Sequence, residues 1–394
     1  MVSRRIAFGL VVGGALALLA QSATAQNAAP NGLLIRAGKA WVAPGQALVR
    51  ASLLVKNGKI VDAVARPTND AKETFLDQAD SVRDFGKNAV LTAGFVDVHT
   101  HAGSDGELAE PVESFTPELR ASRAYDAWAS AWKRITARGV TSAVLAPDDR
   151  NLAGGIAAFV DPGLAAGSDA DNYFKMSLTG AALNRERRPT SLMGAADYLR
   201  ERATELQNLA PAKMTPAQRA LAAVIGGGQS VGIACSTVRE IHAALDATTT
   251  YQLRTFLIHA DEAEECLARI VGAKVPVVLR PLGLQSSRKQ LRLPGVLQKA
   301  GVAFAFAGEN DQDSGLPGLQ TSLAIAVRQG ITAADALASV TTRPAQIAGQ
   351  SERVGTLFTG RDADILVWSG EPWDLRSRLL AVIRNGTILH ENKQ

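Results

Sequence analysis

The chain has 394 residues, of which 46% are hydrophobic and 5% aromatic, and its formal net charge is +4. Arg4 and Arg5 lie in the first 25 residues, so the remaining 369 residues carry only +2, which does not indicate a nucleic-acid-binding protein. The length exceeds that of a typical single domain and suits an α/β barrel of about 250 residues with a small companion domain.

Residues 1–25 predict a secretory signal peptide. Arg4 and Arg5 precede the apolar stretch 6–20, and Ala23-Thr24-Ala25 forms a small-residue cleavage site. The apolar stretch is shorter than the roughly 20 residues that a membrane span needs. We therefore expect an exported protein, periplasmic or secreted, with no membrane anchor after cleavage.

Both ends of the chain carry a hairpin pattern. Residues 52–64 (SLLVKNGKIVDAV) and 381–391 (AVIRNGTILHE) each place Asn-Gly between β-rich runs, and Asn-Gly tolerates the positive φ angles of a type I′ turn. A lone hairpin is only marginally stable in water. We therefore predict that residues 30–93 and 350–392 form one small β-sandwich domain, to which DADILVW (362–368) adds a strand.

Between these ends, residues 94–349 alternate short apolar runs with amphipathic helical segments, the pattern of a parallel (β/α)8 TIM barrel. Of these runs, the third is the least distinct. Active sites of such barrels lie at the carboxyl ends of the strands, so functional residues should cluster there. The eight runs are FVDVHTH (95–101), VTSAVLA (140–146), GIAAFV (155–160), YFKMSLT (173–179), SVGIAC (230–235), TFLIHA (255–260), VPVVLRP (275–281) and VAFAFAG (302–308).

The first run contains two of the chain's five histidines. Because strand side chains alternate, Asp97, His99 and His101 should share one face at the mouth of the predicted barrel. Two imidazoles there can bind a divalent cation, and Asp97 can accept a hydrogen bond that orients a ligating histidine. We expect His242, in a helical segment, and His390, in the second hairpin, not to bind metal.

From about residue 32 to 392 the sequence resembles the amidohydrolase superfamily, nearest to exported members related to imidazolonepropionases and prolidase-like dipeptidases. The motifs that carry the resemblance are LTAGFVDVHTH, FKMSLTG, LIHADEAEE, AKVPVVL and VGTLFTGRDADILVW, in the family's order. The resemblance implies a divalent metal, with zinc expected and one ion rather than two. It also implies a metal-bound hydroxide that attacks a polarised carbonyl.

The same resemblance assigns metal ligands to positions in this chain. His99 and His101 match the pair after strand one, Lys175 matches a lysine after strand four, and His259 matches the histidine after strand six. The alternative for Lys175 is an ordinary lysine on a barrel strand. Family members also carry an aspartate after strand eight, which binds metal and transfers the proton.

Two positions depart from the family's pattern. After strand eight, Glu309 or Asp311 would serve as the catalytic acid, with Asp313 close enough to compete, unless this segment is only a solvated acidic loop. After strand five, where the family has a histidine, the chain has Ala234 and Cys235. Alanine cannot bind a metal, and Cys235 would need a bulge to face the site.

Two further features allow alternatives. Cys235 and Cys266 could form a disulfide in an exported protein, although two buried thiols are the interpretation that we favour. The long segment 180–229 should overhang the mouth, and its arginines in RERR (185–188) either meet a substrate carboxylate or form a solvated loop edge.

The sequence thus predicts an exported amidohydrolase that cleaves C–N bonds of a cyclic amide, a dipeptide or a similar small molecule with a metal-activated water. The alternative is a catalytically degenerate barrel that binds a ligand or serves as a partner subunit, as the departures at strands five and eight suggest. A barrel that uses Lys175 for a Schiff base is a remote third. Beyond the small-molecule substrate, we expect a homo-oligomer or pairing with a related amidohydrolase, and no nucleic-acid partner.

Overall fold

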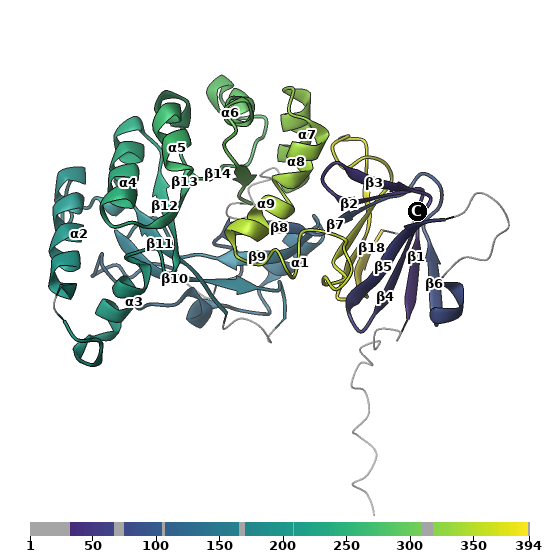
Figure 1. Ribbon diagram of the computed structural model, residues 1–394, viewed down its shortest axis with the longest axis horizontal. Coiled ribbons are helices and arrows are strands. Elements are labelled where there is room, and N and C mark those ends of the chain that lie inside the picture. The colour runs from purple at the N-terminus through teal and green to yellow at the C-terminus, as the bar shows by residue number, and fades with distance from the viewer. Residues whose placement is uncertain are drawn as a thin grey trace, which may run out of the picture.

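The computed structural model describes residues 32–66, 75–104, 107–164, 170–207, 209–308 and 318–392. The predicted signal peptide, residues 1–25, lies outside these ranges. Within them, no helix combines the length and the apolar composition that a membrane span requires. Figure 1 shows a β-domain in which the purple first strands lie beside the yellow last strands, next to a larger part built from the middle of the chain.

The two ends of the chain build a β-sandwich, as the sequence predicts. One sheet contains, in spatial order, β5 (Lys59–Ala65), β4 (Ala51–Lys56), β1 (Leu33–Arg36) and β6 (Ser81–Asp84). The other contains β18 (Thr387–Glu391), β17 (Leu379–Arg384), β16 (Ile365–Trp368), β7 (Val90–Ala93), β2 (Lys39–Ala43) and β3 (Gln46–Val49). Strand β7 joins the two ends, because it pairs parallel with β2 and antiparallel with β16. Both sheets bury side chains in one shared core.

Two Asn-Gly turns meet in this domain. Asn57 and Gly58 join β4 to β5 with φ angles of 50° and 74°, and Asn385 and Gly386 join β17 to β18 with φ angles of 47° and 74°. Both turns therefore have the positive φ angles that the sequence predicts. A Cβ atom on Gly58 would lie 3.3 Å from the carbonyl oxygen of Asn385, so turns from opposite ends of the sequence touch.

The larger part is a nearly closed barrel, and each of the eight predicted runs forms one of its strands. Counted over the described residues, the strands are β8 (Phe95–Thr100), β9 (Val140–Leu145), β10 (Ala153–Val160), β11 (Ala170–Ser177), β12 (Ser230–Cys235), β13 (Arg254–His259), β14 (Val277–Leu279) and β15 (Phe304–Phe306). They lie in chain order across one sheet. The carboxylate of Asp97 links the two edge strands by accepting the backbone N–H of Gly308, just after β15, at 2.8 Å. The predicted fold class, a TIM barrel with a β-sandwich, is confirmed.

The third strand departs from a fully parallel barrel. β10 pairs antiparallel with both β9 and β11, whereas the other barrel pairings are parallel. Only residues 146–152 separate β9 from β10, and a parallel crossover needs a dozen or more residues, so the chain turns back directly. Because this turn follows the carboxyl end of β9, it lies at the mouth of the barrel.

Helices flank the barrel, and Figure 1 shows several of them along the upper side of the sheet. Their amphipathic faces pack on the outward side chains of the strands in one large buried cluster. Several begin at capping residues, among them Ser191, whose hydroxyl accepts the N–H of Gly194 at 3.1 Å. The helices are α1 (Ser130–Thr136), α2 (Leu192–Leu206), α3 (Pro216–Val224), α4 (Val238–Thr250), α5 (Leu267–Ala273), α6 (Arg288–Lys299), α7 (Leu319–Arg328), α8 (Ala333–Ala338) and α9 (Thr342–Ile347).

Candidate active site

The four predicted metal ligands within the described residues come together at the mouth of the barrel. The ring of His99, near the end of β8, has its centroid 5.1 Å from that of His101 and 5.7 Å from that of His259, at the end of β13. Lys175, near the end of β11, is fully buried and joins the histidines through a shared carboxylate, that of Asp149. Three barrel strands therefore deliver one polar cluster.

The backbone turns His259 toward this cluster. In the parallel pair β12 and β13, Cys235 lies beside His259. Cys235 and Leu257 belong to the buried cluster that packs against the helices, whereas Ile258 belongs to the cluster inside the barrel. A regular strand would therefore point His259 outward, but φ angles of 74° at His259 and 42° at Ala260 redirect the chain. Such angles are uncommon outside glycine, and here they occur at two consecutive residues.

Strand β12 contributes no side chain to the cluster. Ala234 pairs with Ser177 and lies inside the barrel, so a methyl group occupies the position where the family resemblance expects a histidine. Cys235 faces the helices instead. Cys235 and Cys266 are free, buried thiols, and burial raises the pKa of both, so they are protonated at neutral pH.

Among the residues of the site that sequence reasoning missed is Asp149. It lies in the turn between β9 and β10, with one carboxylate oxygen 2.5 Å from Nζ of Lys175 and the other 3.6 Å from Nδ1 of His259. The spacing of the second and third runs could have revealed it. A gap of this length cannot hold a crossover helix, so the aspartates of the turn must stay at the mouth.

Burial and charge set the protonation states of the cluster. Burial, with the charges of His101 and Lys175, lowers the pKa of His99 well below its usual value, and burial and Lys175 lower the pKa of His101. Burial alone would raise the pKa of Asp149, but the positive charge of Lys175, with smaller effects of His259 and His99, holds it well below its usual range. At neutral pH, His99 and His101 are therefore neutral and Asp149 is ionised.

Two buried residues fix the position of His99. The hydroxyl oxygen of Tyr173, two residues before Lys175 on β11, lies 2.8 Å from Nδ1 of His99. Asp97 accepts the backbone N–H of His99 at 3.2 Å, so its carboxylate fixes the backbone that carries the imidazole. Because Nδ1 of His99 contacts the hydroxyl of Tyr173, Nε2 is the ring nitrogen that stays available to bind a ligand in the cluster.

The donor atoms suit a divalent metal, although they do not form a finished ligand set. Nε2 of His99 and Nε2 of His101 are buried and have no hydrogen-bond partner among the described residues. Neutral imidazole is a common zinc ligand. Within the same residue ranges, however, no three His, Cys, Asp or Glu side chains converge as a metal site. Glu309, Asp311 and Asp313, the predicted strand-eight acids, lie outside the described residues.

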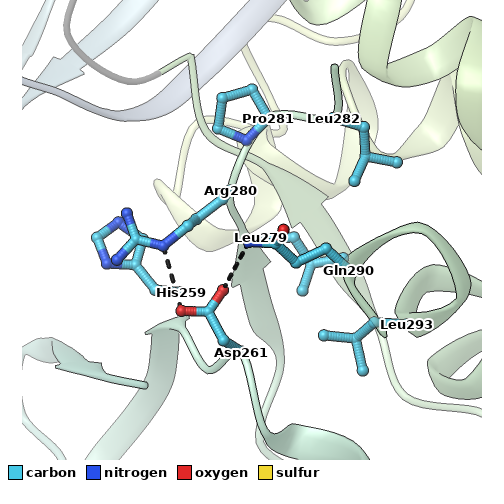
Figure 2. Close-up of a pocket in the computed structure, with 8 residues that line it drawn as sticks. All are labelled: His259, Asp261, Leu279, Arg280, Pro281, Leu282, Gln290 and Leu293. Carbon is cyan, nitrogen blue, oxygen red and sulfur yellow. Dashed lines mark hydrogen bonds and ion pairs between the residues drawn. The ribbon is translucent and has the colours of Figure 1, made fainter. Parts of the chain in front are cut away.

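A pocket adjoins the cluster at His259. Figure 2 shows Asp261 between Arg280 and Gln290, with Nε of Arg280 at 3.3 Å and Nε2 of Gln290 at 3.4 Å from its carboxylate oxygens. The other lining side chains are apolar: Leu279, Pro281, Leu282 and Leu293. The pocket therefore has an apolar wall, a charged pair and an imidazole at one end.

The other two histidines lie outside this cluster, and arginines of the loop 185–188 have partners of their own. His242 lies on α4, with Nδ1 at 2.7 Å from a guanidinium nitrogen of Arg269, and His390 lies on β18 in the sandwich. In the loop 185–188, Arg188 pairs with Glu201 at 3.0 Å, and Arg187 binds backbone and amide oxygens. Arg187 therefore holds neighbouring loops together at the mouth of the barrel.

Comparison with known proteins confirms the enzyme class predicted from the motifs, a hydrolase that acts on C–N bonds. Residues 90–390 match the model of the amidohydrolase family, and the chain belongs to that family. Its members generally depend on a divalent metal.

Two curated relatives are distantly similar to this chain in sequence. The amidohydrolase tasK of Hapsidospora irregularis is 27% identical over 420 residues, covering 89% of this chain, which spans only 40% of the length of that protein. The imidazolonepropionase of Cupriavidus necator is 26% identical over 404 residues, covering 88% of this chain and 92% of the relative.

Solved structures share the fold. The amidohydrolase from Thermotoga maritima superimposes with a TM-score of 0.79 at 22% identity, covering 91% of this chain and 100% of that one. A prolidase solved with N-methylphosphonate-L-proline gives a TM-score of 0.54 at 15% identity, covering 92% of this chain and 100% of that one. At these identities the likeness concerns the fold alone.

Proposed function

We propose that this protein is an exported, metal-dependent amidohydrolase that cleaves the C–N bond of a small amide. One observation carries the proposal: the buried Nε2 atoms of His99 and His101, without hydrogen-bond partners among the described residues, in a cluster that also contains His259. Buried polar nitrogens without partners cost free energy, and binding of a metal ion would relieve that cost.

The chain's own residues would hold the metal and position the substrate. His99 and His101 would bind the cation through Nε2, with His259 beside them, and Tyr173 would keep the ring of His99 in place. When bound, the metal supplies a water of lowered pKa and polarises the scissile carbonyl. The proposed acid that protonates the leaving nitrogen is Glu309 or Asp311, as expected from the sequence.

The substrate would be a cyclic amide, a dipeptide or a similar small molecule. The named relatives include imidazolonepropionases, and the structural neighbours include a prolidase, enzymes whose names point to substrates of this size.

Metal content of the purified mature protein tests the proposal. After growth with added zinc, we expect close to one zinc per chain, and loss of zinc together with amide hydrolysis in His99→Ala and His101→Ala. His242→Ala is the matched control, because this imidazole lies on α4 away from the mouth. A wild-type content below about 0.1 metal per chain would overturn the proposal.

A second candidate function is a barrel without catalysis that binds a ligand or acts as a partner subunit. The methyl group of Ala234 at the strand-five position and the Lys175–Asp149 ion pair favour it. A metal-free wild-type protein that still binds small amides, or that forms a stable complex with an active relative, would support this candidate.

Export rests on the sequence of residues 1–25. Fractionation of cells that express the full chain should place the protein outside the cytoplasm, shortened to begin near Gln26. Deletion of residues 2–25 should retain it inside the cell.

A further inference from the structure

A cavity of about 510 Å³ lies where the barrel meets the sandwich, and it shares no residue with the polar cluster at the mouth. Helix α7 forms one side of the cavity, and residues 371–376 of the loop between β16 and β17 form the other. Figure 1 shows α7 on the side of the barrel that faces the sandwich. We propose that this cavity is a second small-molecule site, which binds an aromatic carboxylate. The inference goes beyond the proposed function and does not depend on a metal.

The size and the position of the cavity suit a small molecule. Its volume falls within the roughly 300–1,000 Å³ of typical ligand sites, which often lie between domains. The two sides are joined, because Gln320 on α7 donates to the backbone oxygen of Ser377 in the loop at 3.1 Å. The cavity is therefore a fixed feature of the junction between the two domains.

The side formed by the loop is ordered by its own hydrogen bonds. The backbone N–H of Asp374 donates to the oxygen of Glu371 at 3.0 Å, and that of Ser377 donates to the oxygen of Asp374 at 2.8 Å. The carboxylate of Glu371 is held through both oxygens, which accept Nζ of Lys39 at 2.6 Å and Nε1 of Trp41 at 2.8 Å. A preformed wall costs a ligand little conformational entropy on binding.

An indole and several aliphatic side chains give the cavity an apolar lining. The ring of Trp373 contacts that of Trp41, with centroids 5.4 Å apart and an angle of 62° between the planes. Ala324 and Val327 line the side formed by α7, and Leu375, which is 59% exposed, lines the opposite side. Aromatic rings gain stability from edge-to-face and offset contacts in addition to burial, so this lining suits a flat aromatic group.

The charges around the cavity leave one cation without a partner. Glu371 pairs with Lys39 at 2.6 Å, and Asp374 pairs with Arg376 at 2.7 Å. Arg328, in the last turn of α7, lines the cavity, and its side chain has no ion pair or hydrogen bond among the described residues. A guanidinium binds a carboxylate through two parallel hydrogen bonds. The ligand that complements both the lining and this cation is therefore an aromatic carboxylate.

Isothermal titration calorimetry of the purified protein with cinnamate tests the inference. Cinnamyl alcohol and cinnamylamine present the same flat ring with a neutral group and with a cation. We expect cinnamate to bind at least about 10-fold more tightly than either analogue. Equal affinities for the three probes, or no binding of cinnamate, would overturn the inference.

Arg328 provides the first variant. Arg328→Met should weaken cinnamate binding at least about 10-fold and leave the affinity for cinnamyl alcohol within about 2-fold. Arg378→Met is the matched control, because Arg378 is an exposed arginine of the same loop and does not line the cavity. It should leave cinnamate affinity within about 2-fold. Equal weakening by the two variants would contradict the assignment, since the effect would then come from the overall charge of the protein.

Asp374 provides a second variant with the opposite sign. Asp374→Asn removes the carboxylate that pairs with Arg376, so the cavity gains one uncompensated positive charge. Cinnamate affinity should rise at least about 2-fold, and the affinity for cinnamylamine should fall. An unchanged or lower affinity for cinnamate would count against an anion site.

His99→Ala distinguishes this site from the proposed active site. Because the cavity shares no residue with the cluster at the mouth, this variant should bind cinnamate as tightly as the wild type does. Loss of cinnamate binding in His99→Ala would locate the probe at the mouth and overturn the second site. A wild-type protein that holds no metal, but binds cinnamate in a way that depends on Arg328, would overturn only the proposed function.

Discussion

Two buried aspartates, at opposite regions of the molecule, show opposite effects of their surroundings. Asp149 lies at the mouth of the barrel, where burial favours the neutral acid but Lys175 holds the pKa well below its usual range. Asp364 lies where the sandwich meets the barrel, and burial raises its pKa to about 7, with Asp161 and Asp362 adding to the rise. Burial is common to both, so the neighbouring charges decide the protonation state.

The difference follows from how the cations are shared. Among the described residues, Lys175 forms an ion pair with one carboxylate, that of Asp149, at 2.5 Å. Near Asp364, the guanidinium of Arg353 is engaged by Asp161 at 2.5 Å and by Asp362 at 2.6 Å. Asp364 itself accepts the backbone N–H of Asn385 at 3.1 Å, a weaker compensation than an ion pair.

Removing the cation at the mouth should have the largest effect on stability. Lys175→Met leaves the charge of Asp149 buried without its ammonium, and we expect the free energy of unfolding of the metal-free protein to fall by about 3–5 kcal/mol. Chemical denaturation measures this loss. An unchanged unfolding midpoint in Lys175→Met would contradict the importance given to the pair.

The second largest effect should be the pH dependence that Asp364 gives to the free energy of unfolding. Its folded pKa of about 7 lies above the ordinary value of 3.8, so the folded state retains the proton. The stability that this group contributes is fully present below about pH 4 and is lost as the pH rises to about 7, by up to about 4 kcal/mol. Asp364→Asn should therefore flatten the profile of unfolding free energy between pH 4 and 7. Profiles of equal slope for variant and wild type would disprove the assignment.

A smaller effect should come from the turn beside Asp364. Gly386 has a φ angle of 74°, and a Cβ atom there would lie 2.9 Å from Cγ1 of Val55. Gly386→Ala should lower the free energy of unfolding by about 1–2 kcal/mol. Because Asn385 donates its N–H to Asp364, the same change should move the titration of Asp364 to higher pH, which difference infrared spectroscopy of the carboxyl band can follow. Gly360→Ala is a control, since its φ angle is also positive and a Cβ there would meet nothing within 4 Å.

The fold could be predicted largely because its signals are local. Asn57-Gly58 and Asn385-Gly386 specify their turns through the backbone preferences of two residues. The apolar runs of the barrel specify strands in the same way, and the motif around His99 and His101 located the site at the end of the first strand. These patterns need no knowledge of distant contacts.

The candidate site was predicted only in part, because its remaining members depend on chain direction and backbone geometry. Asp149 reaches the site because β10 runs backward, which the sequence indicates only through a short gap. His259 was predicted from its motif, but the positive φ angle that turns it into the site was not, because no propensity favours it. In the sequence, Tyr173 cannot be distinguished from other aromatic residues on strands. In the structure, its hydroxyl oxygen lies 2.8 Å from Nδ1 of His99.

The pairing of β7 has a consequence for synthesis of the chain. β7 ends at Ala93, but one of its partners, β16, begins at Ile365, roughly 270 residues later. At about 5–20 residues per second, translation leaves that edge of β7 unpaired for some tens of seconds. Nascent chains, and any product truncated before β16, therefore carry an open strand edge that chaperones and proteases can recognise, so completion of the last strands determines whether the first ones are protected.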